Sequence, residues 1–349
     1  MMERTTGQRQ YRVGLGASRK VMGRAQARHD NAPMEIRQLK YFVRIVELGS
    51  VSRAAADLFI AQPALSHQIS NLEEELKVKL LSRSVRGVSA TEAGEVFYRH
   101  ARAMLRQMDR MRTDVQHAGD YPQGLVSVGL PSSAATLLAP QLIARAAARY
   151  PDIQLQITES LSGHLEELVV NGRIEMSLLF EPIAPDTTAS RRKASSHLDV
   201  RPLLVEQLYL LSAHGVGDGS DVTLAQAAQC ALALPGKSNV TRQIIDAAFQ
   251  AAGFEMKVLA ELDSLATIRA VVASGVGATI GSASIPGGTA GLHVQSVNHP
   301  AMQRRLSLCT FDIVPLSSAA HRIVELITEV TGEQVEAGAW PGASPVPQP

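Results

Sequence analysis

The sequence predicts a mixed α/β protein in three parts: a small helical head, one long helix and a larger two-lobed domain. Three observations predict this organisation. Three short segments with helical spacing of apolar residues fill residues 34–76, and one long apolar seam follows in residues 91–118. Beyond residue 124, segments of period-two and helical spacing alternate. A chain of 349 residues is also long for a single core.

Composition narrows the class of protein. With 45% hydrophobic and 19% charged residues the chain reads as globular, and no apolar run approaches the roughly 18 residues of a membrane span. No secretory signal opens the sequence, so a cytoplasmic location without membrane contact is expected. Cys230 and Cys309 lack a partner spacing and are expected to be reduced, buried thiols. Neither a metal site nor a cofactor is predicted.

Charge divides the chain into two unlike halves. Residues 1–118 carry 20 basic and 12 acidic side chains, a balance of +8, whereas the remainder carries 14 and 21, a balance of −7. Only the front half is therefore predicted to meet a polyanion.

The first 33 residues contain seven basic and two acidic side chains and little apolar periodicity. We expect residues 1–33 to be a disordered basic extension. Three interpretations stay open: translation starts at Met34, the segment is a basic DNA-binding arm, or it is a targeting peptide.

The helix predicted over residues 61–76 has two unlike faces. Apolar side chains form one stripe, at Leu65, Ile69, Leu72 and Leu76, and uncharged polar side chains lie opposite, at Ser66, His67, Ser70 and Asn71. Pro63 suits a first-turn position, so the helix should begin near Gln62. Three glutamates crowd its far end, so only the first half can approach a DNA groove. An ordinary amphipathic surface helix is the alternative.

The neighbours of this helix favour DNA binding. A helix ending at Gly49 and a short helix capped by Ser50 or Ser52 precede it, and only three residues separate the second helix from the third. Such a pair is a helix-turn-helix. The basic excursion that follows, with Arg83, Arg86 and a turn at Gly87, predicts a wing along phosphates or the minor groove. Residues 34–90 would form this DNA-binding domain.

Thr91 is predicted to cap the long helix of residues 91–118. Its apolar seam has alternating spacings of four and three residues: Phe97, Ala101, Met104, Met108, Met111 and Val115. A second copy of the same helix could cover this seam, or the seam could be internal core.

The remaining sequence alternates strand and helix patterns, which predicts two lobes over residues 124–337, each with a largely parallel sheet. The Pro- and Gly-rich residues 338–349 are expected to be a disordered tail. A small ligand should lie between the lobes, at strand ends and helix N-termini.

Short polar segments that open helices are the candidate ligand contacts: Ser132, Ser133, Ser160, Ser162, Gly236, Lys237 and Ser238. For Ser132 and Ser133, simple helix capping is an equal alternative. Because free N–H groups and an ammonium suit an anion, the hypothesis is an organic anion that bridges Ser132 and Lys237.

Two rival functions come from the same half of the chain. The segment ALALPGKS approximates the phosphate loop of an NTPase, but Ala231 replaces its first glycine and Pro235 removes an N–H group. A solute-binding protein would also fit two such lobes, although the basic head argues against it. No nucleophile or metalloprotease motif is present, so the chain is not predicted to be an enzyme.

The segment FVRIVELGSVSRAAADLFIAQPALSHQISNLEEELKVKLLSRSVRGVSATEAG closely resembles the winged helix-turn-helix of LysR-type transcriptional regulators. The resemblance implies that Gln62, Pro63, Ser66 and His67 address bases, and that Arg83 and Arg86 lie near the backbone or the minor groove. Many relatives carry Arg at the position of His67, and imidazole cannot make the bidentate contact of a guanidinium with guanine. Base preference there stays open.

The rest of the chain resembles the family's effector domain, which is built like a periplasmic solute-binding protein. LLVEQLYLLS, LPGKSNVTR and AELDSLATIRAVVASGVGATI are most similar to the nitrogen-assimilation-control subgroup. The resemblance implies a sequence-specific regulator that senses a small effector. It also implies double-stranded promoter DNA and a second copy of the chain, as dimer or tetramer, as partners, with RNA polymerase as a further candidate.

Overall fold

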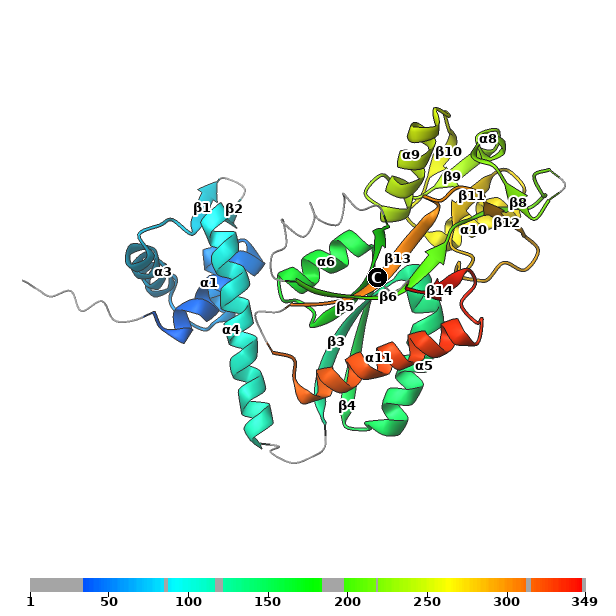
Figure 1. Ribbon diagram of the computed structural model, residues 1–349. Coiled ribbons are helices and arrows are strands. Elements are labelled where there is room, and N and C mark those ends of the chain that lie inside the picture. The colour runs from blue at the N-terminus through cyan, green and yellow to red at the C-terminus, as the bar shows by residue number, and fades with distance from the viewer. Residues whose placement is uncertain are drawn as a thin grey trace, which may run out of the picture.

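The computed structural model describes residues 34–84, 87–116, 122–183, 198–217, 219–311 and 315–346. The expected basic extension of residues 1–33 and Arg86 lie outside the described residues. Figure 1 shows the three parts that the sequence predicts: a helical head, a long helix and a two-lobed α/β domain.

The head consists of three helices and a hairpin. The helices are α1 (Ile36–Leu48), α2 (Val51–Asp57) and α3 (Gln62–Leu76), and β1 (Leu81–Ser84) pairs with β2 (Gly87–Ala90) in antiparallel register. Gly49 ends α1 with a φ of 61°, which is a left-handed conformation that glycine adopts freely. Ser50 then caps α2 by accepting a hydrogen bond from the Arg53 N–H. The predicted winged helix-turn-helix is confirmed.

α3 begins at Gln62 with Pro63 in its first turn, as predicted. Leu65, Ile69 and Leu72 are buried in the core of the head, but Leu76 is 38% exposed. The predicted apolar stripe is therefore one turn too long.

Glu73 occupies the buried side of the last turn of α3 instead. Its carboxylate accepts hydrogen bonds from the N–H groups of Leu80 and Leu81, at 2.9 and 3.1 Å, and from Nζ of Lys79 at 2.6 Å. Burial alone would raise the pKa of Glu73, but these hydrogen bonds outweigh it and hold the pKa below its ordinary value. The carboxylate thus fastens the base of the wing to α3.

The long helix α4 (Glu92–Gln116) divides its apolar seam between two environments. Thr91 caps it, because its Oγ1 accepts a hydrogen bond from the Gly94 N–H at 3.0 Å. The rings of Phe97 and Phe42 pack edge to face with their centroids 5.0 Å apart, so this part of the seam belongs to the core of the head. Two methionines further along are exposed, Met104 by 51% and Met111 by 55%. Internal packing accounts for the first half of the seam only.

The first lobe is built on a six-stranded sheet in the order β14-β6-β13-β5-β3-β4. The strands are β3 (Gly124–Pro131), β4 (Ile153–Ser160), β5 (Met176–Pro182), β6 (Leu198–Gln207), β13 (Gln303–Phe311) and β14 (Ala343–Pro345). β3 runs parallel to β4 and β5, but β13 is antiparallel to both β5 and β6. The sheet is mixed, so the prediction of a largely parallel sheet is wrong here. Helices α5 (Ser132–Arg149) and α11 (Ser318–Glu336) cover one face, and α6 (Ser162–Val170) covers the other (Figure 1).

The second lobe has its own six-stranded sheet in the order β10-β9-β11-β7-β12-β8. The strands are β7 (Tyr209–Ser212), β8 (Asp221–Val222), β9 (Ala231–Leu234), β10 (Lys257–Glu261), β11 (Ala278–Gly281) and β12 (His293–Val297). β9 runs parallel to β10 and β11, whereas β7 is antiparallel to its two neighbours, so this sheet is also mixed. Helices α8 (Leu224–Ala227) and α9 (Val240–Ala252) pack on one face and α10 (Leu265–Ala273) on the other.

The residues after Gly338 correct a prediction. The expected disordered tail is instead folded as far as residue 346, because β14 pairs with β6 and Trp340 is only 1% exposed. The indole Nε1–H donates to Oε1 of Glu206 at 2.9 Å, and the Gln207 N–H donates to the Gly342 carbonyl at 2.9 Å. Glu206 and Gln207 are the last two residues of β6, where the chain leaves the first lobe for the second. The tail therefore stabilises that connection; residues 347–349 lie outside the described residues.

Trp340→Ala should destabilise the two-lobed domain by about 3–5 kcal/mol, because it opens a large cavity and removes a hydrogen bond to a buried carboxylate. Urea unfolding followed by far-UV circular dichroism would measure the loss. Trp340→Phe retains most of the ring volume and should cost clearly less. Equal stability of Trp340→Ala and the parent would contradict the structural role assigned to the tail.

Candidate functional site

The exposed side of α3 carries the residues that the sequence assigns to base contact. Gln62, Pro63 and His67 are exposed, and Ser66 is half-buried. His67 lies one turn before Asn71, with 3.4 Å between His67 Nδ1 and Asn71 Nδ2. Gln62, Ser66, His67 and Asn71 offer hydrogen-bonding side chains on the helix face opposite the core, so they could enter a major groove.

The wing adds positive charge beside this helix. Arg83 on β1 is exposed, and a hollow between α3 and the wing is lined by Ser70, Lys79 and Arg83. α3 and the wing therefore share one surface. Arg86, the second basic residue predicted in the wing, lies outside the described residues.

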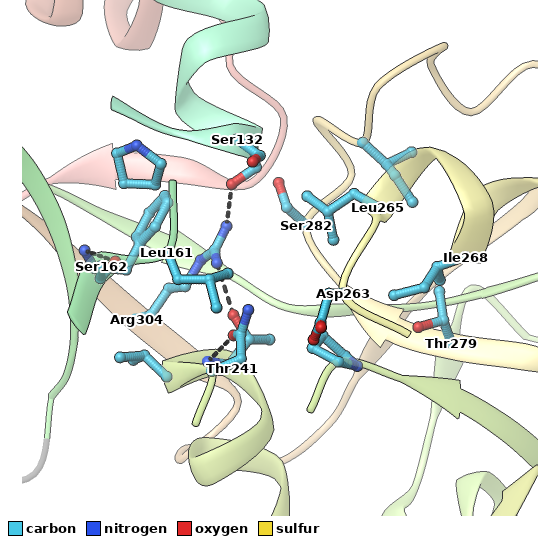
Figure 2. Close-up of a pocket in the computed structure, with 18 of the residues that line it drawn as sticks. Ser132, Leu161, Ser162, Thr241, Asp263, Leu265, Ile268, Thr279, Ser282 and Arg304 are labelled. Atoms are coloured by element: carbon cyan, nitrogen blue, oxygen red, sulfur yellow. Dashed lines mark hydrogen bonds between the residues drawn. The ribbon is translucent and has the colours of Figure 1, made fainter. Parts of the chain in front are cut away.

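A cleft between the two lobes is the candidate site for a small ligand. It encloses about 730 Å³, part of it open to solvent, and side chains of both lobes line it (Figure 2). Four of the predicted ligand contacts line it, namely Ser132, Ser133, Ser160 and Ser162. The other three, Gly236, Lys237 and Ser238, do not, although Pro235 and Asn239 on either side do. The structure therefore does not support an anion that bridges Ser132 and Lys237.

The loop around Lys237 is tied to the start of α9 by hydrogen bonds on both of its sides. Nη1 of Arg242 donates to the Pro235 carbonyl at 3.1 Å, and the side chain of Asn239 accepts the Thr241 N–H at 2.8 Å. Lys237 itself is exposed. The loop thus uses its polar groups to begin α9 rather than to cradle a ligand.

The sequence did not identify Arg304, which lies at the centre of the cleft (Figure 2). Its guanidinium lies over the Phe180 ring at 3.4 Å and donates to Ser133 at 2.8 Å and Thr241 at 2.7 Å. It also pairs with Glu206 at 2.6 Å. Because Ser133 begins α5 in the first lobe and Thr241 lies in α9 of the second, one side chain connects both lobes. An arginine inside a strand gives no sequence signal of such a role.

Asp263 is a second lining residue that the sequence left unassigned. It lies two residues after β10, at the carboxyl end of a parallel strand, and this position could have identified it.

Two helices of the first lobe present uncapped N-termini to the cleft. α5 begins after Pro131 and α6 after Leu161, and neither helix has a side-chain cap. Capping was the alternative role for Ser132 and Ser133; instead Ser133 Oγ accepts from Arg304, and Ser162 Oγ accepts the Phe180 N–H at 3.0 Å. The first N–H groups of both helices therefore remain available to a ligand.

Comparison with known proteins assigns both halves of the chain. The helix-turn-helix model of bacterial lysR-family regulatory proteins matches residues 36–95, and the LysR substrate-binding domain model matches residues 119–332. The chain belongs to the LysR family of transcriptional regulators. Its domains therefore bind DNA and a small effector, and relatives in this family are regulators rather than enzymes or solute-binding proteins.

Similar full-length proteins support this assignment. The nitrogen assimilation regulatory protein nac of Klebsiella aerogenes is 34% identical over 84% of this chain and 94% of its own length. The regulator BbuR of Bordetella bronchiseptica is 30% identical over 90% of this chain and 95% of its own. The predicted resemblance to the nitrogen-assimilation-control subgroup is confirmed.

Solved structures of LysR-family proteins show the same fold. Full-length OxyR C199D of Pseudomonas aeruginosa superposes with a TM-score of 0.64 at 23% identity, covering 91% of this chain and 99% of that one. CbnR, solved with its target DNA, gives a TM-score of 0.55 at 22% identity, covering 85% and 100%.

The remaining chemistry of the described residues is sparse. Among them no helix is long and apolar enough to cross a bilayer. Within the same ranges, no three His, Cys, Asp or Glu side chains gather as metal ligands would. Cys309 is buried and Cys230 half-buried, both are free thiols, and burial raises the pKa of each.

Proposed function

We propose that this LysR-family regulator reads its operator through Gln62, Pro63, Ser66 and His67, with Arg83 and Arg86 on the DNA backbone or in the minor groove. The observation that carries the proposal is the polar, uncharged outer face of the first half of α3, which leaves base-edge contacts free of charge repulsion. The N-terminus of α3 follows Ala61 without a side-chain cap, which favours a nearby phosphate.

A second copy of the chain is the proposed partner of α4. Met104 and Met111 are one heptad apart, so they lie on the same side of the helix, and both are more than half exposed. Burying this apolar face against its own copy would form a dimer, and a dimer would present two recognition helices to paired half-sites.

The cleft is the proposed effector site, and the uncapped N-termini of α5 and α6 support an effector with an anionic group. A cytoplasmic location is part of the same proposal, because a promoter-binding protein must reach the chromosome. RNA polymerase is a candidate partner because it binds to the same promoters.

Gln62→Ala and Ser66→Ala should each relax sequence preference at one base pair, by about 1–3 kcal/mol for each lost contact. Fluorescence anisotropy with the operator and with single-base variants would measure this. Full operator preference in both variants would remove α3 as the reading helix.

Arg83→Ala should behave differently, because a phosphate contact carries no sequence information. Binding to all DNA sequences should weaken together, and the slope of log K against log salt should fall by about one unit. Arg37→Ala is the matched control, since Arg37 is exposed but pairs with Glu35 on α1. An unchanged salt slope in Arg83→Ala would count against the wing contact.

Met104→Glu should dissociate the dimer, because it places a charge in the proposed apolar seam. Sedimentation equilibrium of the full chain would detect the monomer. Met104→Leu preserves the apolar surface and should remain dimeric. If Met104→Glu and Met111→Glu both sediment like the parent, α4 is not the interface.

A further inference from the structure

The two edges of the cleft have opposite electrostatic character. On the first lobe, uncapped helix N-termini at Ser132 and Ser162 present partial positive charge. On the second lobe, the helices that border the cleft are self-capped, α9 by Asn239 and α10 by Ser264. An anionic group is therefore favoured on the first lobe.

Among the described residues that line the cleft, no unpaired basic side chain is available to neutralise a multiply charged anion. Arg304 is the one Lys, Arg or His among the described residues that line it, and its charge already pairs with Glu206 at 2.6 Å. Most of its N–H groups are used, because Nε donates to Glu206, Nη2 to Ser133 and Nη1 to Thr241. A single carboxylate bound by N–H groups and hydroxyls suits this edge better than a multiply charged anion.

The second lobe presents the opposite charge. Asp263 lines the cleft opposite Ser132 and Leu161 (Figure 2), is exposed, and has no hydrogen-bond or ion-pair partner among the described residues. A carboxylate in this position repels an anion and attracts a donor such as an ammonium group.

Thr279 is an independent sign of a missing polar partner. It lines the same side of the cleft, it is only 3% exposed, and within the described residues its hydroxyl has no hydrogen-bond partner. The Oγ1 atom is not one of the fully buried unpaired atoms of the described residues, so it is open to the cleft, and a ligand that reaches it would supply the missing partner.

Between these polar edges the lining is apolar. Leu265 of α10 is half-buried and faces the cleft (Figure 2), and it packs against a buried apolar cluster that includes Ile268, Leu211 and Ile285. A compact aliphatic group would fit against this lining, whereas a second charged group would be desolvated there at a cost.

We propose that the cleft binds a small α-amino acid with an aliphatic side chain. Its carboxylate meets the N-termini of α5 and α6, its ammonium pairs with Asp263, and its side chain packs against Leu265. The inference depends on the proposed effector cleft and adds the chemical class of the ligand. Because the two charges of the zwitterion contact different lobes, the bound ligand links them.

Matched ligands test the two charges separately. Isothermal titration calorimetry of the full-length protein would compare L-leucine, L-isoleucine and L-valine with their 2-oxo acids, which lack the ammonium group, and with the corresponding amines, which lack the carboxylate. At least one amino acid should bind at least about tenfold more tightly than both of its analogues.

Asp263→Asn should weaken binding of that amino acid by about two- to fivefold, as expected for an ion pair at an exposed carboxylate, and leave the 2-oxo acid unaffected or bound more tightly. Asp221→Asn is the matched control, an exposed aspartate of the same lobe outside the cleft, and should bind as the parent does. Lys237→Ala should also leave affinity unchanged. Melting temperatures of all variants establish that they are folded.

The possible outcomes distinguish a failure of the amino-acid inference from a failure of the proposed effector cleft. Binding of a 2-oxo acid as tight as that of its amino acid, or undiminished amino-acid affinity in Asp263→Asn, overturns the zwitterion and leaves an effector cleft in place. If none of these acids, amines or amino acids binds, the amino-acid inference fails, and the effector cleft loses its chemical support too. Operator binding, measured separately, is untouched by either result.

Discussion

The ion pair between Glu206 and Arg304 is the contact on which the two-lobed domain depends. Neither residue is more than 5% exposed, and they face each other across β6 and β13, where these strands approach the second lobe. Glu206 also accepts hydrogen bonds from Ser282 and Trp340, so its oxygens are fully used. Removing either charge would leave the other buried and unpaired, which costs about 3–5 kcal/mol. Since Arg304 also bonds to both lobes, the same interaction that stabilises the connection sets the shape of the cleft.

The head is organised by a buried carboxylate in a similar way. Glu73 is 8% exposed and accepts N–H groups at the start of the wing, so it determines where β1 leaves α3. An apolar side chain could not replace it without leaving two backbone donors unpaired. The three acidic residues at the end of α3 thus have different roles, because Glu74 is exposed while Glu73 is structural. Acidity at this end of the helix does not by itself indicate repulsion from DNA.

The sequence predicted the architecture because periodicity reports which face of each element is buried. It predicted that α3 begins near Gln62, where the helix does begin, and it gave the strand β9 with the bounds that the structure has. It failed where a contact joins residues far apart in the chain. The tail was expected to be disordered because Gly and Pro dominate it, yet Trp340 packs against Glu206, 134 positions away. Arg304 was missed for the same reason, and Lys237 was assigned to the ligand because a helix start in sequence does not reveal which way the loop faces.

Helix capping connects the two binding surfaces. Where α2, α9, α10 and α11 begin, a Ser or Asn side chain caps the first turn, but α3, α5 and α6 begin after Ala61, Pro131 and Leu161, whose side chains cannot accept a hydrogen bond. An apolar residue at this position forgoes about 1 kcal/mol of helix stability. All three of these uncapped helices face the proposed DNA or effector site, although the capped helices α9 and α10 also border the cleft, from the second lobe. Without a cap these helices are less stable locally, but their first N–H groups remain available as donors to anions. The uncapped N-terminus of α3 would then bind a DNA phosphate, and those of α5 and α6 would bind the carboxylate of the effector.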